Sequence, residues 1–159
     1  MVSPHLANML GADCHKQKFL LSTCSAEKEV KYGRRVTEVF VKYIGGELFK
    51  LPTLVECDHI PRDKSEIPTP EIARNFSHLK EIADQIPPLD PNANIEILIG
   101  CDAPELLKVR AFRNGPKEAP WAQKLNLGWT LSGQVCPDRV GGPVHVSTHR
   151  TALNIPEPN

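Results

Sequence analysis

Apolar and polar residues alternate most regularly in the first half of the chain, at the two-residue period of β-strands. The stretches 19–23 and 36–44 both follow this period, and the second carries apolar side chains on both faces. Apolar residues on both faces are typical of a strand inside a sandwiched or closed sheet. Gly45 and Gly46 predict a tight hairpin turn. Further strands are predicted at 48–51, 54–57 and 127–132.

Helical spacing of apolar residues occurs in two places. Ser3 followed by Pro4 predicts the N-cap and first residue of a short helix, which Gly11 ends. Thr69 predicts the N-cap of a longer helix over 70–86, where apolar residues recur every three or four positions until a Pro-Pro pair stops it. The region before it, 58–70, is rich in proline and charge and is expected to be a loop.

The stretch 95–107 combines a predicted strand with a predicted helix. Residues 95–99 are almost entirely aliphatic, and Gly100 ends the run where a side chain is hard to accommodate or where φ is positive. Asp102 and Glu105 have the spacing of a capping box, and Pro104 falls in the first helical turn. We therefore expect a strand, a closely packed glycine and a short helix capped by Asp102.

Together these elements predict a mainly β fold with a few short helices, in the α+β class. A chain of 159 residues is long enough for one domain with its own core. We place that domain at 1–135. Residues 136–159 contain several glycines and prolines and little that can pack, so they are expected to form a flexible tail or linker.

Three sequence blocks follow one another in the same order as similar blocks in a known family. They are Leu98-Ile99-Gly100-Cys101-Asp102, then Pro120-Trp121-Ala122, then Leu127-Gly128-Trp129-Thr130-Leu131-Ser132-Gly133. This series resembles the aspartic peptidase domain of BEL/Pao-type retrotransposon polyproteins. The resemblance covers 1–135 and implies a retropepsin-like closed β-barrel, incomplete at the N-terminus. It also implies a polypeptide substrate and a homodimer, because each protomer of a retropepsin supplies one catalytic aspartate.

The catalytic motif of that family is missing from this chain. Aspartic peptidases use two carboxylates that share one proton around a water molecule, so that one acts as acid and the other as base. Retropepsins carry each aspartate in Asp-Thr-Gly or Asp-Ser-Gly, and no aspartate here precedes Ser or Thr. The residues that follow the aspartates are Cys14, His59, Lys64, Gln85, Pro91, Ala103 and Arg139. We therefore assign no catalytic residue and expect the chain as written to be inactive.

The position of the missing motif can be inferred from the residues that follow it in the family. Val2-Ser3 and Leu10-Gly11 match the sequel of Asp-Ser-Gly, so the motif is expected just upstream of Met1, in an N-terminally truncated copy. Asp102 is not a substitute catalytic residue, since its expected capping role with Glu105 already explains it.

Metal sites and cofactors are not expected. His145 and His149 have a spacing that could bind metal on a helix, but the β-branched residues around them disfavour one. Cys57 and His59 could bind zinc together with a third cysteine, yet their spacing does not require a metal. Buried free cysteines are the favoured explanation. The third cysteine at such a zinc site would be Cys101 or Cys136.

Other candidate sites have simpler structural explanations. Cys24, beside Ser22 and Ser25, would be a nucleophile only with a histidine base nearby, which the sequence does not place there. The Gly45-Gly46 pair lacks the lysine and helix of a phosphate loop. Trp121 and Trp129 could stack on a ligand, but we expect both in the core.

Charge and cysteine content restrict the partners and the compartment. Lys and Arg number 19 and Asp and Glu number 19, so no net charge favours nucleic acid or an anionic membrane. No apolar run reaches membrane-spanning length. Five widely spaced cysteines are typical of free thiols in a reducing compartment, so a cytoplasmic or nuclear location is expected.

Two functional hypotheses follow. The first is a retrotransposon-derived aspartic peptidase-like domain that is inactive because its catalytic loop is absent. The second is a noncatalytic binding or dimerisation module of the same origin. An unrelated β-rich scaffold would require the first and last sequence blocks to match by coincidence.

Overall fold

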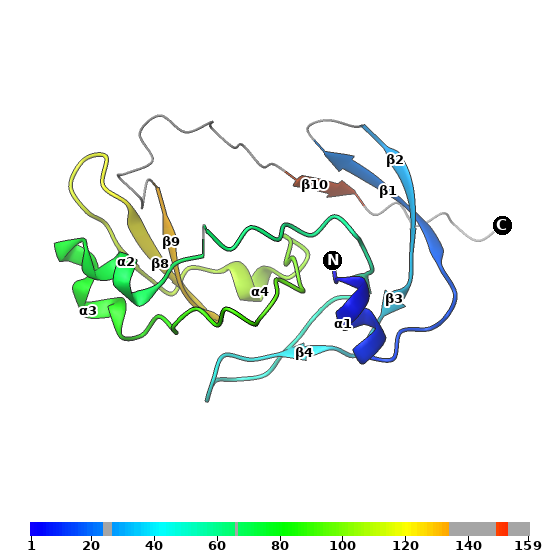
Figure 1. Ribbon diagram of the computed structural model, residues 1–159, viewed down its shortest axis with the longest axis horizontal. Coiled ribbons are helices and arrows are strands. Elements are labelled where there is room, and N and C mark those ends of the chain that lie inside the picture. Colours follow the sequence, from blue (N-terminus) through cyan, green and yellow to red (C-terminus); the bar gives the residue numbers. More distant parts are fainter. Residues whose placement is uncertain (24–26, 66, 134–148, 153–159) are drawn as a thin grey trace.

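The computed structural model describes residues 1–23, 27–65, 67–133 and 149–152. Figure 1 shows a mainly β chain with a few short helices. Its strands pair into four small antiparallel sheets of two or three strands, and the described residues do not form one closed barrel. The mainly β class with short helices is therefore confirmed. The sheets are smaller and more separate than the alternation of apolar residues predicts.

The first sheet begins with the hairpin of β1 (Gln17–Thr23) and β2 (Glu29–Gly33). Phe19 and Leu21 lie on one face of β1 because strand side chains alternate, and both are buried. The strand predicted at 19–23 is confirmed and begins two residues earlier. The other buried members of this cluster are Val55 and Cys57.

The third strand of this sheet comes from the end of the chain. β10 (His149–Ala152) pairs antiparallel with β1, from Thr23 opposite His149 to Leu20 opposite Ala152. These four residues belong to the segment predicted to be a flexible tail, so that expectation is corrected for them. Backbone groups on the outer side of β1 need hydrogen-bond partners, and an added strand supplies them. Residues 134–148 and 153–159 lie outside the described residues.

The single strand predicted at 36–44 is wrong, because the chain changes pairing partner within it. Glu38 has φ of 58°, a left-handed conformation that interrupts the two-residue period. Ile44 is 85% exposed, so its apolar character does not mark a buried strand. The region instead contains β3 (Arg35–Val36), paired with β6 (Leu54–Val55), and β4 (Phe40–Val41), paired with β5 (Phe49–Lys50).

The predicted turn between β4 and β5 is confirmed. Gly45 has φ of 72°, and the N–H of Gly46 donates to the carbonyl of Tyr43 at 2.7 Å. A side chain is strained at that φ, so a glycine suits this position. The hydroxyl of Tyr43 donates to the carbonyl of Gln85 at 3.0 Å and links the hairpin to the helical region.

The first helix begins and ends as predicted. The hydroxyl of Ser3 accepts the N–H of Leu6 at 3.0 Å, and Pro4 opens α1 (Pro4–Met9). Gly11 follows the helix with φ of 70°, the conformation expected of a glycine after a C-cap.

The long helix predicted at 70–86 is divided into three pieces. The hydroxyl of Thr69 caps the first piece as expected, accepting the N–H of Ile72 at 3.4 Å. Phe76 is extended, with ψ of 121°, and this breaks the helix. The break lets apolar residues of all three pieces pack on a neighbouring sheet. The pieces are α2 (Pro70–Arg74), η1 (Ser77–Leu79) and α3 (Lys80–Ala83). No helix within the described residues has the length and apolar character needed to cross a membrane.

That neighbouring sheet consists of β7 (Ala111–Arg113), β8 (Trp121–Leu125) and β9 (Gly128–Ser132). β9 confirms the strand predicted at 127–132, whereas β7 and β8 were not predicted. One face of the sheet packs against the helical pieces through Ala122 and Trp129. The buried helical residues in this cluster are Ala73, Leu79, Ile82, Ala83 and Ile86.

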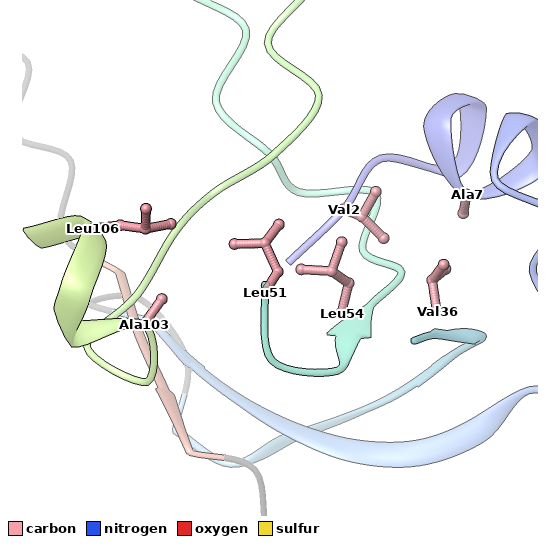
Figure 2. Packing of buried hydrophobic residues seen from close by; sticks show 7 residues of the cluster. All are labelled: Val2, Ala7, Val36, Leu51, Leu54, Ala103 and Leu106. Atoms are coloured by element: carbon pink, nitrogen blue, oxygen red, sulfur yellow. The ribbon is translucent and has the colours of Figure 1, made fainter. Parts of the chain in front are cut away.

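A separate apolar cluster joins the N-terminal residues to residues 103–106. Figure 2 shows Leu51 and Leu54 lying between Val2 on one side and the helix α4 (Pro104–Leu107) on the other. This cluster brings together segments about a hundred residues apart, so it forms only after the chain has folded. Its buried residues are Val2, Ala7, Val36, Leu51, Leu54, Ala103 and Leu106.

A largely buried ion pair lies beside this cluster. The Nε of Arg34 donates to Oε2 of Glu56 at 2.5 Å, and the Nη2 of Arg34 donates to Oε1 of Glu56 at 3.1 Å. The side chains are only 17% and 10% exposed. Arg34 also donates to Asn8 of α1 at 2.7 Å, so the pair connects this helix to β6. The hydrogen bonds from Arg34 hold the pKa of Glu56 below its ordinary value of 4.5.

We predict that Glu56→Gln lowers the melting temperature by several degrees at pH 7, because it removes the charge that Arg34 pairs with. A depressed carboxyl pKa contributes stability that is present above the unfolded-state value and lost as the pH falls through the folded-state value. The difference between the two proteins should therefore be constant above about pH 5 and shrink below pH 4.5. Thermal unfolding monitored by circular dichroism measures it. Glu81→Gln, on an exposed position of α3, is the control and should change little. A pH-independent difference would contradict the prediction.

Candidate functional site

The N-terminal segment of the chain lies between two others and pairs with both. Val2 is fully buried and forms a parallel bridge with Glu56 and an antiparallel bridge with Ile97. On the β6 side, Val2 donates to the carbonyl of Val55 at 2.9 Å and accepts from Cys57 at 2.9 Å. On the other side, Ser3 donates to Glu96 at 2.8 Å, and Leu98 donates to Met1 at 3.0 Å. The segment therefore has the hydrogen bonding of a central strand.

Within the predicted strand 95–99, the structure contains a single bridge, between Ile97 and Val2. The residues of 95–99 are extended beside the N-terminal segment, but all are only partly buried, and the expected alternation of burial is absent. The backbone bonds of 95–99 to the N-terminal segment run from Ser3 to Glu96 and from Leu98 to Met1. The family resemblance implies that 95–99 lies beside the segment after Ser3, whereas its backbone pairs with Met1 to Ser3.

A cavity of about 630 Å³ opens at the end of this three-segment arrangement. Volumes of roughly 300–1,000 Å³ are typical of ligand sites. Leu51 and Leu54 belong both to its wall and to the buried cluster shown in Figure 2. The wall is formed by Met1, Leu51 to Val55, Leu98 to Ala103, and Leu107.

Two charged groups lie at this cavity. The amino group of Met1 donates to the carbonyl of Leu98 at 2.8 Å. Burial lowers the pKa of this amino group, and the nearby negative charge of Asp102 acts in the opposite direction. Asp102 itself is exposed at the cavity wall. The lining is therefore mainly apolar, with the carboxylate of Asp102 and the amino group of Met1 as its charged groups.

The predicted capping role of Asp102 is wrong. The N-cap of α4 is Ala103, and no side chain caps this helix. The N–H of Ala103 donates to the carbonyl of Gly100 at 3.1 Å, and this turn places Asp102 one residue outside the helix start. Glu105 does not complete a capping box either, since its carboxylate binds Lys108 and Arg110.

The predicted close approach of two backbones at Gly100 is also wrong. Gly100 is exposed and is not among the glycines with positive φ. A Cβ there would have one neighbour within 4 Å, Oδ1 of Asp102 at 3.1 Å. The close approach occurs instead at Gly33, where a Cβ would lie 2.2 Å from the carbonyl oxygen of Glu56. The tight contact is thus between β2 and the residue after β6.

The other candidate residues are dispersed. Cys57 is buried, whereas Cys101 and His59 are exposed, and no group of three potential ligands gathers within the described part of the chain. Several earlier candidates lie outside the described residues, so their placement stays a prediction. They are Cys24, Ser25, Cys136, His145 and the side chain of His149.

The two tryptophans behave differently. Trp129 is buried as predicted, and its indole N–H donates to Gln85 at 3.1 Å. Trp121 is 40% exposed, so its predicted core position is wrong. Pairing explains the difference: Trp121 lies opposite Ser132 and Trp129 opposite Lys124, which places the two rings on opposite faces of the sheet.

The sequence pattern does not predict the cavity wall at 51–55. It predicts strands at 48–51 and 54–57, but the segments that face them across the cavity are far away in sequence. Pro52 was the one available signal, since proline marks an edge or interruption of a sheet.

Comparisons with protein-family models, with curated protein sequences and with solved structures found no match to this chain.

We predict that Gly33→Ala is destabilising and that Gly100→Ala is tolerated. A methyl group at Gly33 meets a backbone carbonyl that cannot move aside cheaply, and overpacking of this kind costs about 1–3 kcal/mol. At Gly100 the methyl group meets only a movable carboxylate. Urea unfolding of both variants measures the difference. Equal stability of the two variants would contradict the placement of the tight contact.

We further predict that Asp102→Ala and Asp102→Ser both stay within about 0.5 kcal/mol of the unmodified protein, as surface changes usually do. Loss of a true N-cap would cost about 0.5–2 kcal/mol in the alanine variant and be restored by serine. Ser3→Ala is the comparison, because Ser3 does cap a helix. A larger loss in Asp102→Ala than in Asp102→Ser would restore the capping role.

Proposed function

We propose that this chain is a retropepsin-like aspartic peptidase domain of the BEL/Pao retrotransposon type that supplies no catalytic carboxylates of its own. Its substrate class is polypeptide, and the active form of such a domain is a homodimer. Within the family the strands complete a closed barrel. Without an Asp-Ser-Gly or Asp-Thr-Gly motif, the residues present do not hydrolyse peptide bonds.

One geometric observation supports the proposal beyond the sequence blocks. In the resembling family, the aliphatic segment ending in Gly-x-Asp packs beside the loop that carries the catalytic aspartate. Here Val2 pairs with Ile97, and the segment continues into Gly100, Asp102 and α4. The resemblance at residues 2–3 and the resemblance at residues 98–102 rest on separate parts of the sequence, and the adjacency of these parts supports the proposal.

The cysteines are consistent with an intracellular location for such a domain. Cys14 and Cys101 are exposed free thiols, and Cys57 is a buried one. Exposed free thiols persist in a reducing compartment, so we place the protein in the cytoplasm or nucleus.

A noncatalytic binding or dimerisation module is the second candidate, and one surface favours it. Phe112 is 60% exposed and Trp121 is 40% exposed. Phe112 lies opposite Gln123, two residues from Trp121, so the two rings share the face of the β7–β9 sheet that turns away from the helices. Exposed aromatic groups of this kind often mark an interaction surface.

We predict that the purified chain shows no pepstatin-sensitive cleavage of a peptide mixture near pH 5, because none of its aspartates lies in Asp-Ser-Gly or Asp-Thr-Gly. An apolar segment ending in Asp-Ser-Gly, placed before Met1, should create such cleavage, and the matched Asn-Ser-Gly version should not. Mass spectrometry of the peptide mixture measures both.

Pepstatin-sensitive cleavage by the chain itself would contradict the assignment of no catalytic residues. A folded, dimeric Asp-Ser-Gly version without activity would favour the noncatalytic module over the peptidase-like domain.

A further inference from the structure

The sheet of β7, β8 and β9 has an outer face that turns away from the helical pieces. Strand side chains alternate, so Trp121 and Gln123 of β8 lie on this outer face, whereas Ala122 between them packs against the helices. Phe112 lies opposite Gln123 and is a diagonal neighbour of Trp121, a relation that corresponds to about 7–8 Å. Phe112 and Trp121 are 60% and 40% exposed. Two exposed rings therefore lie next to each other, beside one side-chain amide.

Positive charge is concentrated around these rings, although the whole sequence has no net charge. Five of the six charged residues within 108–124 are basic, namely Lys108, Arg110, Arg113, Lys117 and Lys124. Lys108 and Arg110 share the carboxylate of Glu105. Within the described part of the chain, no carboxylate forms an ion pair with the other three. The sheet therefore carries a local excess of positive charge.

The cations lie at both ends of the pair of rings. Arg113 ends β7 at the side of the sheet where β8 begins, and Lys117 lies in the loop that joins these two strands. At the other end, Arg110 precedes β7 and donates to Asn126 at 3.1 Å. An extended polyanion that runs along β8 would therefore meet positive charge on either side of the rings.

We propose that this outer face binds single-stranded nucleic acid, with unstacked bases on the rings of Phe112 and Trp121 and phosphates at the flanking cations. Aromatic rings on a sheet surface with cations nearby are the recurring elements of such sites. The inference names a partner for the noncatalytic binding module and rests on that second candidate function. It does not depend on the peptidase-like assignment.

The chemistry of the face favours this occupant over a second copy of the chain. A second copy would bring the same cations together, and like charges across an interface are unfavourable. Gln123, Thr130 and Ser132 add polar groups to the face, because Thr130 lies opposite Gln123 and Ser132 lies opposite Trp121. Such side chains hydrogen-bond to bases and phosphates, whereas an apolar partner would leave them unpaired.

Fluorescence anisotropy with a fluorescein-labelled oligothymidylate of about twelve nucleotides tests the proposal at about 50 mM salt. Trp121→Ala and Phe112→Ala should each weaken binding about fivefold or more, because each removes a stacking surface. Trp121→Phe keeps a ring and should retain most of the affinity. Phe40→Ala, at a phenylalanine of β4 that is 52% exposed, is the matched control and should change affinity less than about twofold.

The phosphate contacts are tested separately by the dependence of binding on salt. Lys117→Gln should reduce the slope of log affinity against log salt concentration by about 0.7, the value for one phosphate contact with a single strand. Lys42→Gln, at an exposed lysine of the β4–β5 hairpin, should leave the slope unchanged. Binding of the corresponding duplex should not respond to Trp121→Ala, because its bases are stacked within the double helix. An oligouridylate of the same length determines whether RNA or DNA is preferred.

Three results would overturn the inference: no binding of either single strand at about 100 µM, unchanged affinity in both folded alanine variants, or an equal loss in folded Phe40→Ala. Melting curves establish which variants are folded, and Trp121→Phe and Lys117→Gln test the same surface if an alanine variant unfolds. These results leave the peptidase-like assignment untouched, because that assignment is tested by cleavage after addition of Asp-Ser-Gly. Conversely, binding of nucleic acid with no gain of cleavage in that experiment would support this inference alone.

Discussion

The arrangement of the cavity depends on the hydrogen bonding of the first three residues. Met1, Val2 and Ser3 exchange backbone hydrogen bonds with residues 55–57 on one side and residues 96–98 on the other. Val2 is fully buried between them, so its side chain also contributes to the apolar cluster. These bonds hold together segments that are about fifty and a hundred residues apart. Together with the apolar cluster, they hold the two walls of the cavity beside each other.

Several neighbouring contacts strengthen this arrangement. Arg34 and Glu56 form a largely buried ion pair directly beside the pairing of Val2, and Arg34 also reaches Asn8 of α1. Ser3 caps the same helix while its hydroxyl binds the carboxylate of Glu96. The hydrogen bonds from Ser3 and His5 hold the pKa of Glu96 below its ordinary value, so the carboxylate stays charged over a wide pH range. The N-terminal helix is thus tied to both of its flanking segments.

The helical pieces and the β7–β9 sheet form a second packing unit with a different character. Ala122 and Trp129 pack against the helices, and Arg113 and Lys124 each lie 5.8 Å from the ring centre of Trp129. The opposite face of the sheet exposes Phe112 and Trp121. The exposed aromatic face therefore lies on a different packing unit from the cavity at the N-terminal segment.

Local features were determined by the sequence itself. The cap at Ser3, the cap at Thr69, the turn at Gly45 and the strand at 19–23 all depend on neighbouring residues, and all are present. Tertiary structure decided the rest. The strand predicted at 36–44 divides because its two halves pair with different strands, and Asp102 fails to cap because a turn from Gly100 shifts the helix start. The cavity, the burial of Val2 and the tight contact at Gly33 arise between residues far apart in the chain. Periodicity and spacing describe only near neighbours, so they carry no information about which distant segments will meet.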